Sequence, residues 1–176
     1  MGNYIVSFFG NRRVSDRELV FNDLLIKLKD IFVLAPADIR YDDTLLYCGG
    51  YGDFGQIVSD AIDLFRKQNP GFEFRKIFVT PYITPEYKLN KYMKEFYDEI
   101  LYPPLESVPP RLAISRRNRW MIDNSDLVIV YMEDPCGNTR NWIEYAYRRR
   151  KPVCFVAEKE TKLVRSLLRV RYRKPE

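Results

Sequence analysis

Two short glycine-containing segments each stand between a pattern typical of a buried strand and a pattern typical of a helix. The first is Cys48-Gly49-Gly50-Tyr51-Gly52-Asp53, and the second is Cys136-Gly137-Asn138-Thr139. The first N–H groups of a helix have no partner within the helix, and the helix dipole is positive there, so such a segment attracts an anion. Glycine also lets a ligand approach the backbone closely. Two such segments predict one shared crevice for a nucleotide-like molecule.

The order of strand and helix patterns predicts the fold class. Apolar strand patterns cover residues 4–9, 44–48, 76–80, 99–102, 127–131 and 153–157, and helix patterns lie between most of them, with further helices expected near 88–96 and 159–168. This alternation favours an α/β fold: a doubly wound, mostly parallel, Rossmann-like sheet with helices on both faces. Right-handed crossovers would bring the loops after Phe9, Cys48, Thr80 and Tyr131 to one edge of that sheet.

Length and charge limit the remaining choices. The 176 residues are expected to form a single domain, 1–176, with a basic C-terminal tail at 165–176. No apolar run is long enough to span a membrane, and the chain enters its first strand without a secretory signal, so we expect a cytoplasmic protein without a membrane partner. The net charge of +5 gathers near 148–151 and in the tail. It suits either solvated helix ends or weak contact with nucleic acid, and a homo-oligomer remains open.

Histidine is absent, which removes several classes of chemistry. Nucleophile–histidine pairs, histidine-ligated zinc and imidazole acid–base catalysis are all excluded. Three cysteines without a Cys-x-x-Cys pair do not suggest a disulfide framework or a zinc knuckle. We therefore expect neither a metal nor a cofactor. Any catalysis would depend on carboxylates, tyrosine, lysine, arginine or backbone dipoles.

The helix expected at 110–124 carries two polar residues on its apolar side. Arg117 shares a face with Ala113 and Met121, and Asn118 lies beside Ile114. Burial of an unpaired guanidinium or amide is costly, so both need partners. Arg117 either forms an internal salt bridge, for which Asp126 is the candidate, or binds a ligand phosphate. Asn118 would then orient a loop or a ribose.

Three segments resemble the YpsA-like branch of the SLOG superfamily, a Rossmann-like group that also contains the DprA fold and the LOG-type nucleotide phosphoribohydrolases. They are residues 47–54, residues 100–109 and Ala113-Ile114-Ser115-Arg116-Arg117-Asn118-Arg119-Trp120-Met121. The resemblance extends from Ser7 to about Val156. It implies a doubly wound sheet that binds nucleotides or nucleotide-derived signals, such as an ADP-ribose-like or cyclic nucleotide ligand.

The resemblance also guides the choice of site residues. Relatives often have Gly-His-Arg after the first strand, where this chain has Gly10-Asn11-Arg12, so Gly10 and Arg12 are carried over. The LOG enzymes resemble Gly-Gly-x-Gly-Thr-x-x-Glu near the second glycine segment. Here Glu144 stands at the interval of their catalytic glutamate, although the intervening glycine and threonine are replaced. Glu144 is therefore the candidate catalytic residue, with a structural pair to Arg148 as its alternative.

The expected ligand-binding residues share a position at the carboxyl ends of strands or on the helix at 110–124. They are Gly10, Arg12, Cys48, Gly49, Gly50, Gly52, Asp53, Tyr82, Arg117, Asn118, Gly137, Asn138 and Thr139. Asp53 is either a helix N-cap or a ribose ligand, and Tyr82 either covers a base or packs on the surface.

Three functions compete. The first is binding of a nucleotide-derived small molecule by a sensor or a sequestering protein, which we prefer. The others are N-glycosidic hydrolysis and DprA-like nucleic-acid binding.

Overall fold

The computed structural model describes residues 3–33, 44–83, 95–134 and 136–157. Its strands are β1 (Tyr4–Gly10), β2 (Thr44–Cys48), β3 (Arg75–Val79), β4 (Glu99–Leu101), β5 (Leu127–Tyr131) and β6 (Val153–Phe155). Its helices are α1 (Arg17–Val33), α2 (Gly52–Gln68), α4 (Pro110–Asp123) and α5 (Asn138–Arg148). The helix expected near 88–96 falls largely outside the described residues, and the helix near 159–168 and the tail at 165–176 lie wholly outside them.

All six strands form one parallel sheet in the order β4-β3-β2-β1-β5-β6. The expected doubly wound α/β fold is therefore confirmed. From β1 the chain first builds outward through β2, β3 and β4, and it then returns to place β5 on the other side of β1. The carboxyl ends of β1 and β5 thus flank the topological switch point, where parallel α/β sheets bind their ligands.

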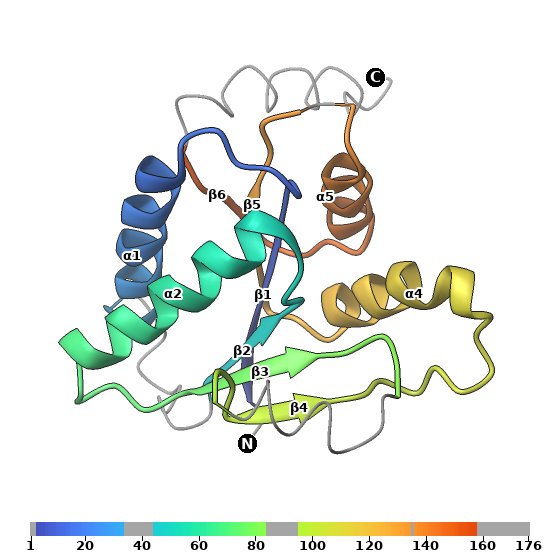
Figure 1. Cartoon of the computed structure of the whole chain (residues 1–176), viewed down its shortest axis with the longest axis horizontal. Helices are drawn as coiled ribbons and strands as arrows, with labels where there is room; N and C mark the ends of the chain where they lie inside the picture. Colours follow the sequence, from blue (N-terminus) through green and yellow to red (C-terminus); the bar gives the residue numbers. More distant parts are fainter. Residues whose placement is uncertain (1–2, 34–43, 84–94, 135, 158–176) are drawn as a thin grey trace.

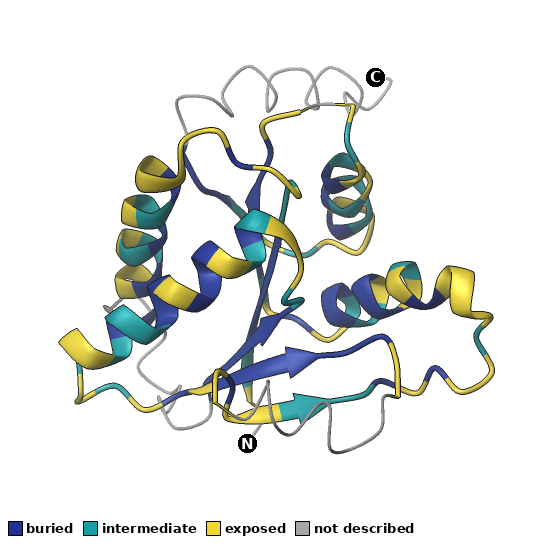
Figure 2. Ribbon diagram, viewed as in Figure 1, coloured by how far each residue is buried: buried dark blue, intermediate teal, exposed yellow. Residues whose placement is uncertain are grey.

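Two helices cover each face of the sheet (Figure 1), with α1 and α2 on one side and α4 and α5 on the other. Strands β2, β3 and β5 are almost wholly buried, whereas the edge strand β4 is partly exposed (Figure 2). Each helix turns a buried stripe toward the sheet. In α2 this stripe includes Phe54, Ile57, Ala61 and Phe65, spaced at three and four residues. Strands covered on both faces explain the continuous apolar runs in the sequence.

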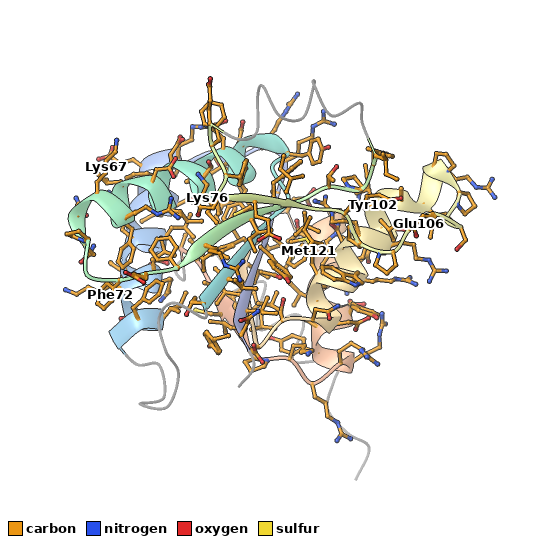
Figure 3. All side chains as sticks on the ribbon, turned by 90° about the horizontal axis from the view of Figure 1, so that it is seen from below. Lys67, Phe72, Lys76, Tyr102, Glu106 and Met121 are labelled. Atoms are coloured by element: carbon orange, nitrogen blue, oxygen red, sulfur yellow. The ribbon has the colours of Figure 1, made fainter. Side chains whose placement is uncertain are left out.

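Lys76 and Met121 mark the two faces of the sheet in Figure 3. Lys76, on β3, points toward α2, where its Nζ donates to the carbonyl of Ser59 and to Asp63. Met121, on α4, is fully buried in the core between the opposite face and the α4–α5 pair. Among the described residues, no helix combines the length and the apolar character needed to cross a bilayer.

Candidate functional site

A cavity of about 530 Å³ lies at the carboxyl ends of β1 and β2 and beside the loop after β5, against the first turns of α2 and α5 and one side of α4. Ten of the thirteen expected ligand-binding residues line it: Gly10, Arg12, Cys48, Gly49, Gly52, Arg117, Asn118, Gly137, Asn138 and Thr139. The two glycine segments therefore face one crevice at the same sheet edge. Gly50, Asp53 and Tyr82 are absent from its lining, as is the described part of the loop after Thr80, residues 81–83.

Three of the glycines expected to bind a ligand are required by packing within the protein. A Cβ on Gly10 would lie 2.3 Å from the ring of Phe54, and one on Gly50 would lie 2.4 Å from Phe78. Gly50 and Gly52 also have φ of 70° and 75°, which side chains rarely adopt. A Cβ on Gly52 would press on the backbone of Arg12 at 3.0 Å. The glycines of the first segment thus allow protein groups to approach one another closely. In a sequence, a glycine required for such packing looks the same as a glycine required for ligand binding.

The start of α5 offers free backbone donors. Gly137 is its N-cap and supplies no side chain, and the first turn contains no acidic residue. The N–H groups of Cys136 and Gly137 donate to Asp134, whereas those of Asn138 and Thr139 have no acceptor within the described residues. These two N–H groups, unpartnered among the described residues, and the positive end of the helix dipole are features that favour an anion at this helix start.

The start of α2 is less available than that of α5. The N–H of Asp53 already donates to the carbonyl of Arg12 at 2.8 Å. The Asp53 carboxylate accepts from the N–H of Val14 and forms an ion pair with Arg17 at 3.2 Å. The N-cap of α2 is Tyr51, so the interpretation of Asp53 as an N-cap is wrong. Asp53 instead holds the loop after β1 against α2.

Arg117 is a buried cation that faces the crevice. Its side chain is only 4% exposed, and Nη1 donates to the carbonyls of Val79 and Gly49 at 2.7 and 3.2 Å. Its Nε is buried without a hydrogen-bond partner, and the described residues provide no carboxylate for it. The alternative of a salt bridge to Asp126 is wrong, since none of the ion pairs between described residues includes Arg117. The Asp126 carboxylate accepts from the N–H of Ile5 at 2.8 Å.

Burial changes the pKa of the Arg117 guanidinium. Loss of solvation lowers the pKa of Arg117 to about 10, with Tyr51 and Tyr82 acting in the opposite direction. The group is therefore positive at neutral pH, although no anion of the described residues compensates it. The ring of Tyr51, 56% exposed, lies 5.8 Å from the guanidinium carbon. Tyr82 is near enough to affect the charge while lying outside the crevice lining.

Glu144 and Cys48 take structural positions. Glu144 accepts from Arg140, one turn earlier on α5, at 2.9 Å, so the suggested pairing partner Arg148 is wrong. Glu144 does not line the crevice. Cys48 does line it, but its residue is 1% exposed, and burial raises the pKa of its thiol to about 12. A thiol that remains protonated at neutral pH is a poor nucleophile.

Sequence reasoning missed nine of the residues that line the crevice, and Ile114 and Trp142 are two of them. Ile114, on α4, is 47% exposed although apolar, and Trp142, on α5, is half-buried. Trp142 follows Thr139 by three residues, which places both on one face of the helix. This three-residue spacing is the sequence signal that could have identified Trp142 as a crevice residue. It identifies Trp142 only once α5 is known to begin at the crevice.

The fold is Rossmann-like, and its crevice lies at the topological switch point of the sheet. No family model and no curated protein matches the chain. Among solved structures, it resembles DNA processing protein A from Helicobacter pylori, in a study of how that protein binds single-stranded DNA. The TM-score is 0.57 at 17% identity, over 88% of this chain and 65% of the other. This chain thus spans less than two thirds of that protein, and the likeness concerns the fold.

Proposed function

We propose that the crevice binds the phosphate group of a nucleotide unit, between Arg117 and the first turn of α5. The carrying observation is the buried guanidinium of Arg117, which has an unpartnered Nε and no carboxylate among the described residues. A buried cation without an anion is costly, and a phosphate that accepts from it would recover that cost. The free N–H groups of Asn138 and Thr139 would supply further donors.

Binding is favoured over N-glycosidic hydrolysis. Cleavage of that bond passes through an oxocarbenium-like state, which a carboxylate must stabilise. Among the described residues, none that lines the crevice is an aspartate or glutamate. The two carboxylates expected from the sequence, Asp53 and Glu144, pair with Arg17 and Arg140. We therefore keep the hydrolase as the weaker hypothesis.

The phosphate could belong to a single-stranded nucleic acid or to a free nucleotide. The comparison with solved structures favours single-stranded nucleic acid. The structure of similar fold concerns single-stranded DNA binding, and the sequence resembles the superfamily that includes the DprA fold. A free nucleotide signal, our preference from the sequence and the ligand suggested by the YpsA-like segments, is the second candidate. A cavity of about 530 Å³ has the size of an ordinary small-molecule site, which supports it.

The test compares Arg117→Met with the wild type. Methionine fills a similar space without charge, so we expect at least a tenfold loss of affinity, since a charged hydrogen-bonded contact contributes about 1.5–3 kcal/mol. Binding of AMP, adenosine and a single-stranded oligonucleotide would be measured by calorimetry. The matched control is Arg116→Ala, because Arg116 is exposed on the same helix and does not line the crevice. We expect it to change AMP affinity less than twofold.

Each arm of this experiment has a distinct meaning. Binding of AMP but not adenosine supports a phosphate site, and a strong preference for the oligonucleotide over AMP supports the nucleic-acid candidate. A preference for AMP supports the free nucleotide. Unchanged affinity in Arg117→Met would remove Arg117 from the site and overturn the proposal.

A further inference from the structure

We propose that the crevice also holds the nucleobase, in a slot between Trp142 of α5 and Ile114 of α4, with the base edge on the amide of Asn118. This inference rests on the proposed function, because the phosphate at Arg117 fixes where the rest of the ligand lies. It adds a second recognition element on the same crevice. The ligand is then a base-bearing nucleotide rather than a sugar phosphate or inorganic phosphate.

Trp142 has a ring face available. It lines the crevice and remains half-buried at the edge of the core. Within the described part of the chain, its indole stacks on no other ring, whereas Trp120 stacks on Tyr47 with centroids 5.8 Å apart. Bases stack on aromatic side chains irrespective of their identity. An indole that lines the crevice therefore fits a planar ligand better than it fits water.

Ile114 supplies the opposing wall. It is an apolar side chain, 47% exposed, on the side of α4 that also carries Asn118 one turn later. Both residues line the same cavity as Trp142. An aromatic side chain on one helix and an aliphatic one on the neighbouring helix offer apolar surfaces to the two faces of a base. Contact with a base would remove both surfaces from water.

Asn118 is a second, independent indication of a ligand. The residue is only 9% exposed, and no hydrogen bond between described residues uses its amide. Among the described residues, the buried side-chain polar atom without a partner is Arg117 Nε, so the Asn118 amide itself is open to the crevice. Because Asn118 lines the crevice, a ligand is the available partner. An amide donates and accepts side by side, and the adenine edge presents the complementary pair, which asparagine binds in two hydrogen bonds.

The positions along α5 suit one nucleotide. Trp142 follows Thr139 by three residues, so it stands about 4.5 Å further along the helix axis than the N-terminal turn that would hold the phosphate. A single ribose can join a phosphate at that turn to a base beside the indole. The phosphate and base positions therefore belong to one nucleotide unit, whether that unit is free or part of a strand.

The experiment compares AMP with ribose 5-phosphate, which lacks the base, by calorimetry on the full chain. We expect the wild type to bind AMP at least tenfold more tightly, the scale of one stacking contact. Trp142→Ala should lower AMP affinity at least tenfold, leaving only the preference for AMP that Asn118 supplies, and should leave ribose 5-phosphate affinity unchanged. Trp142→Phe retains an aromatic face and should recover most of the AMP affinity, which guards against a folding defect in the alanine variant.

The proposed contact between Asn118 and the base is tested by changing the hydrogen-bonding groups on the edge of the base. Purine riboside 5′-monophosphate lacks the exocyclic amine of AMP, so the wild type should bind it several-fold more weakly. Asn118→Ala should bind the two alike.

The outcomes separate the two proposals. If the wild type binds AMP and ribose 5-phosphate equally, and Arg117→Met binds neither, the base slot is refuted and the phosphate site stands. Loss of ribose 5-phosphate binding in Trp142→Ala would also refute the slot, since the indole would then support the phosphate site. If the wild type binds neither probe, both proposals fail.

Discussion

Phe54 occupies the position where a side chain on Gly10 would begin. A Cβ on Gly10 would lie 2.3 Å from the Phe54 ring, which is 3% exposed and stacks on Tyr131 with centroids 5.9 Å apart. The ring is enclosed and has little room to move. The end of β1 and the start of α2 thus approach each other because residue 10 lacks a side chain. This contact forms part of the crevice wall.

Gly10→Ala is therefore expected to destabilise the fold. Overpacking of an enclosed position usually costs about 1–3 kcal/mol in the free energy of unfolding. Urea denaturation would measure it. The control is Gly71→Ala, because a Cβ on Gly71 meets no atom within 4 Å. We expect the control to remain within about 0.5 kcal/mol of the wild type. Equal stability of the two variants would contradict the packing role of Gly10.

Asp63 should stabilise the fold by compensating a buried lysine. The Lys76 side chain is fully buried, and its Nζ lies 2.8 Å from Asp63 and 4.9 Å from the centroid of the Tyr97 ring. Asp63→Asn would leave the ammonium without its carboxylate. We expect a loss of about 1–3 kcal/mol, below the cost for a fully buried pair, since the Asp63 side chain is 41% exposed.

Two further variants make this prediction specific. Adding Lys76→Met to Asp63→Asn should recover stability, because the uncompensated charge is removed. Glu99→Gln breaks an exposed pair with Arg75 and should change stability by less than about 0.5 kcal/mol. If the double variant is less stable than Asp63→Asn alone, the ammonium is not the source of the cost.

Cys48 should make stability fall in mild alkali. Burial raises the pKa of its thiol from 9.0 to about 12, so above pH 9 the unfolded chain loses this proton while the folded chain keeps it. The unfolded state then binds fewer protons, and the free energy of unfolding decreases as pH rises from 9 toward 12. Cys48→Ala should show a shallower decrease between pH 9 and 10, measured by urea denaturation.

The control for this pH dependence is the exposed thiol. Cys136→Ala should keep the slope of the wild type, because Cys136 is exposed in the fold. Tyrosines with a raised pKa, among them Tyr97, contribute only as pH exceeds their ordinary value of 10.0. An unchanged slope in Cys48→Ala between pH 9 and 10 would show that the thiol does not cause the decrease.

Sequence patterns predicted the sheet well because it is covered on both faces. The bounds of β2 and β5 agree with the expected 44–48 and 127–131, since continuous apolar runs that end in small-residue loops leave little choice of boundary. The prediction that the loops after the strands share one edge of the sheet followed from strand–helix alternation. Arg117 and Asn118 were found because polar residues on an apolar helix face are unusual.

The site was harder to predict, because its details depend on contacts distant in sequence. Gly10 and Gly50 resembled ligand-binding glycines, yet Phe54 and Phe78 fill the space they leave. Asp53 is held by Val14, which lies on another loop. Trp142 gains its position only from the way in which α5 docks beside α4. Local periodicity contains none of this information.

Arg12 should contribute one phosphate contact if a nucleic-acid strand is the ligand. It is exposed and lines the crevice, whereas its neighbour Arg13 is exposed and lies outside the lining. Each phosphate neutralised on a single strand contributes about −0.7 to the slope of log K against log salt concentration. Arg12→Ala should therefore make the measured slope shallower by about 0.7, and Arg13→Ala should leave it unchanged. Equal slopes in the two variants would mean that the strand does not pass Arg12, and a free nucleotide would become the better candidate. Both variants lose one positive charge, so a difference between their slopes reports the position of the arginine and not the net charge of the protein.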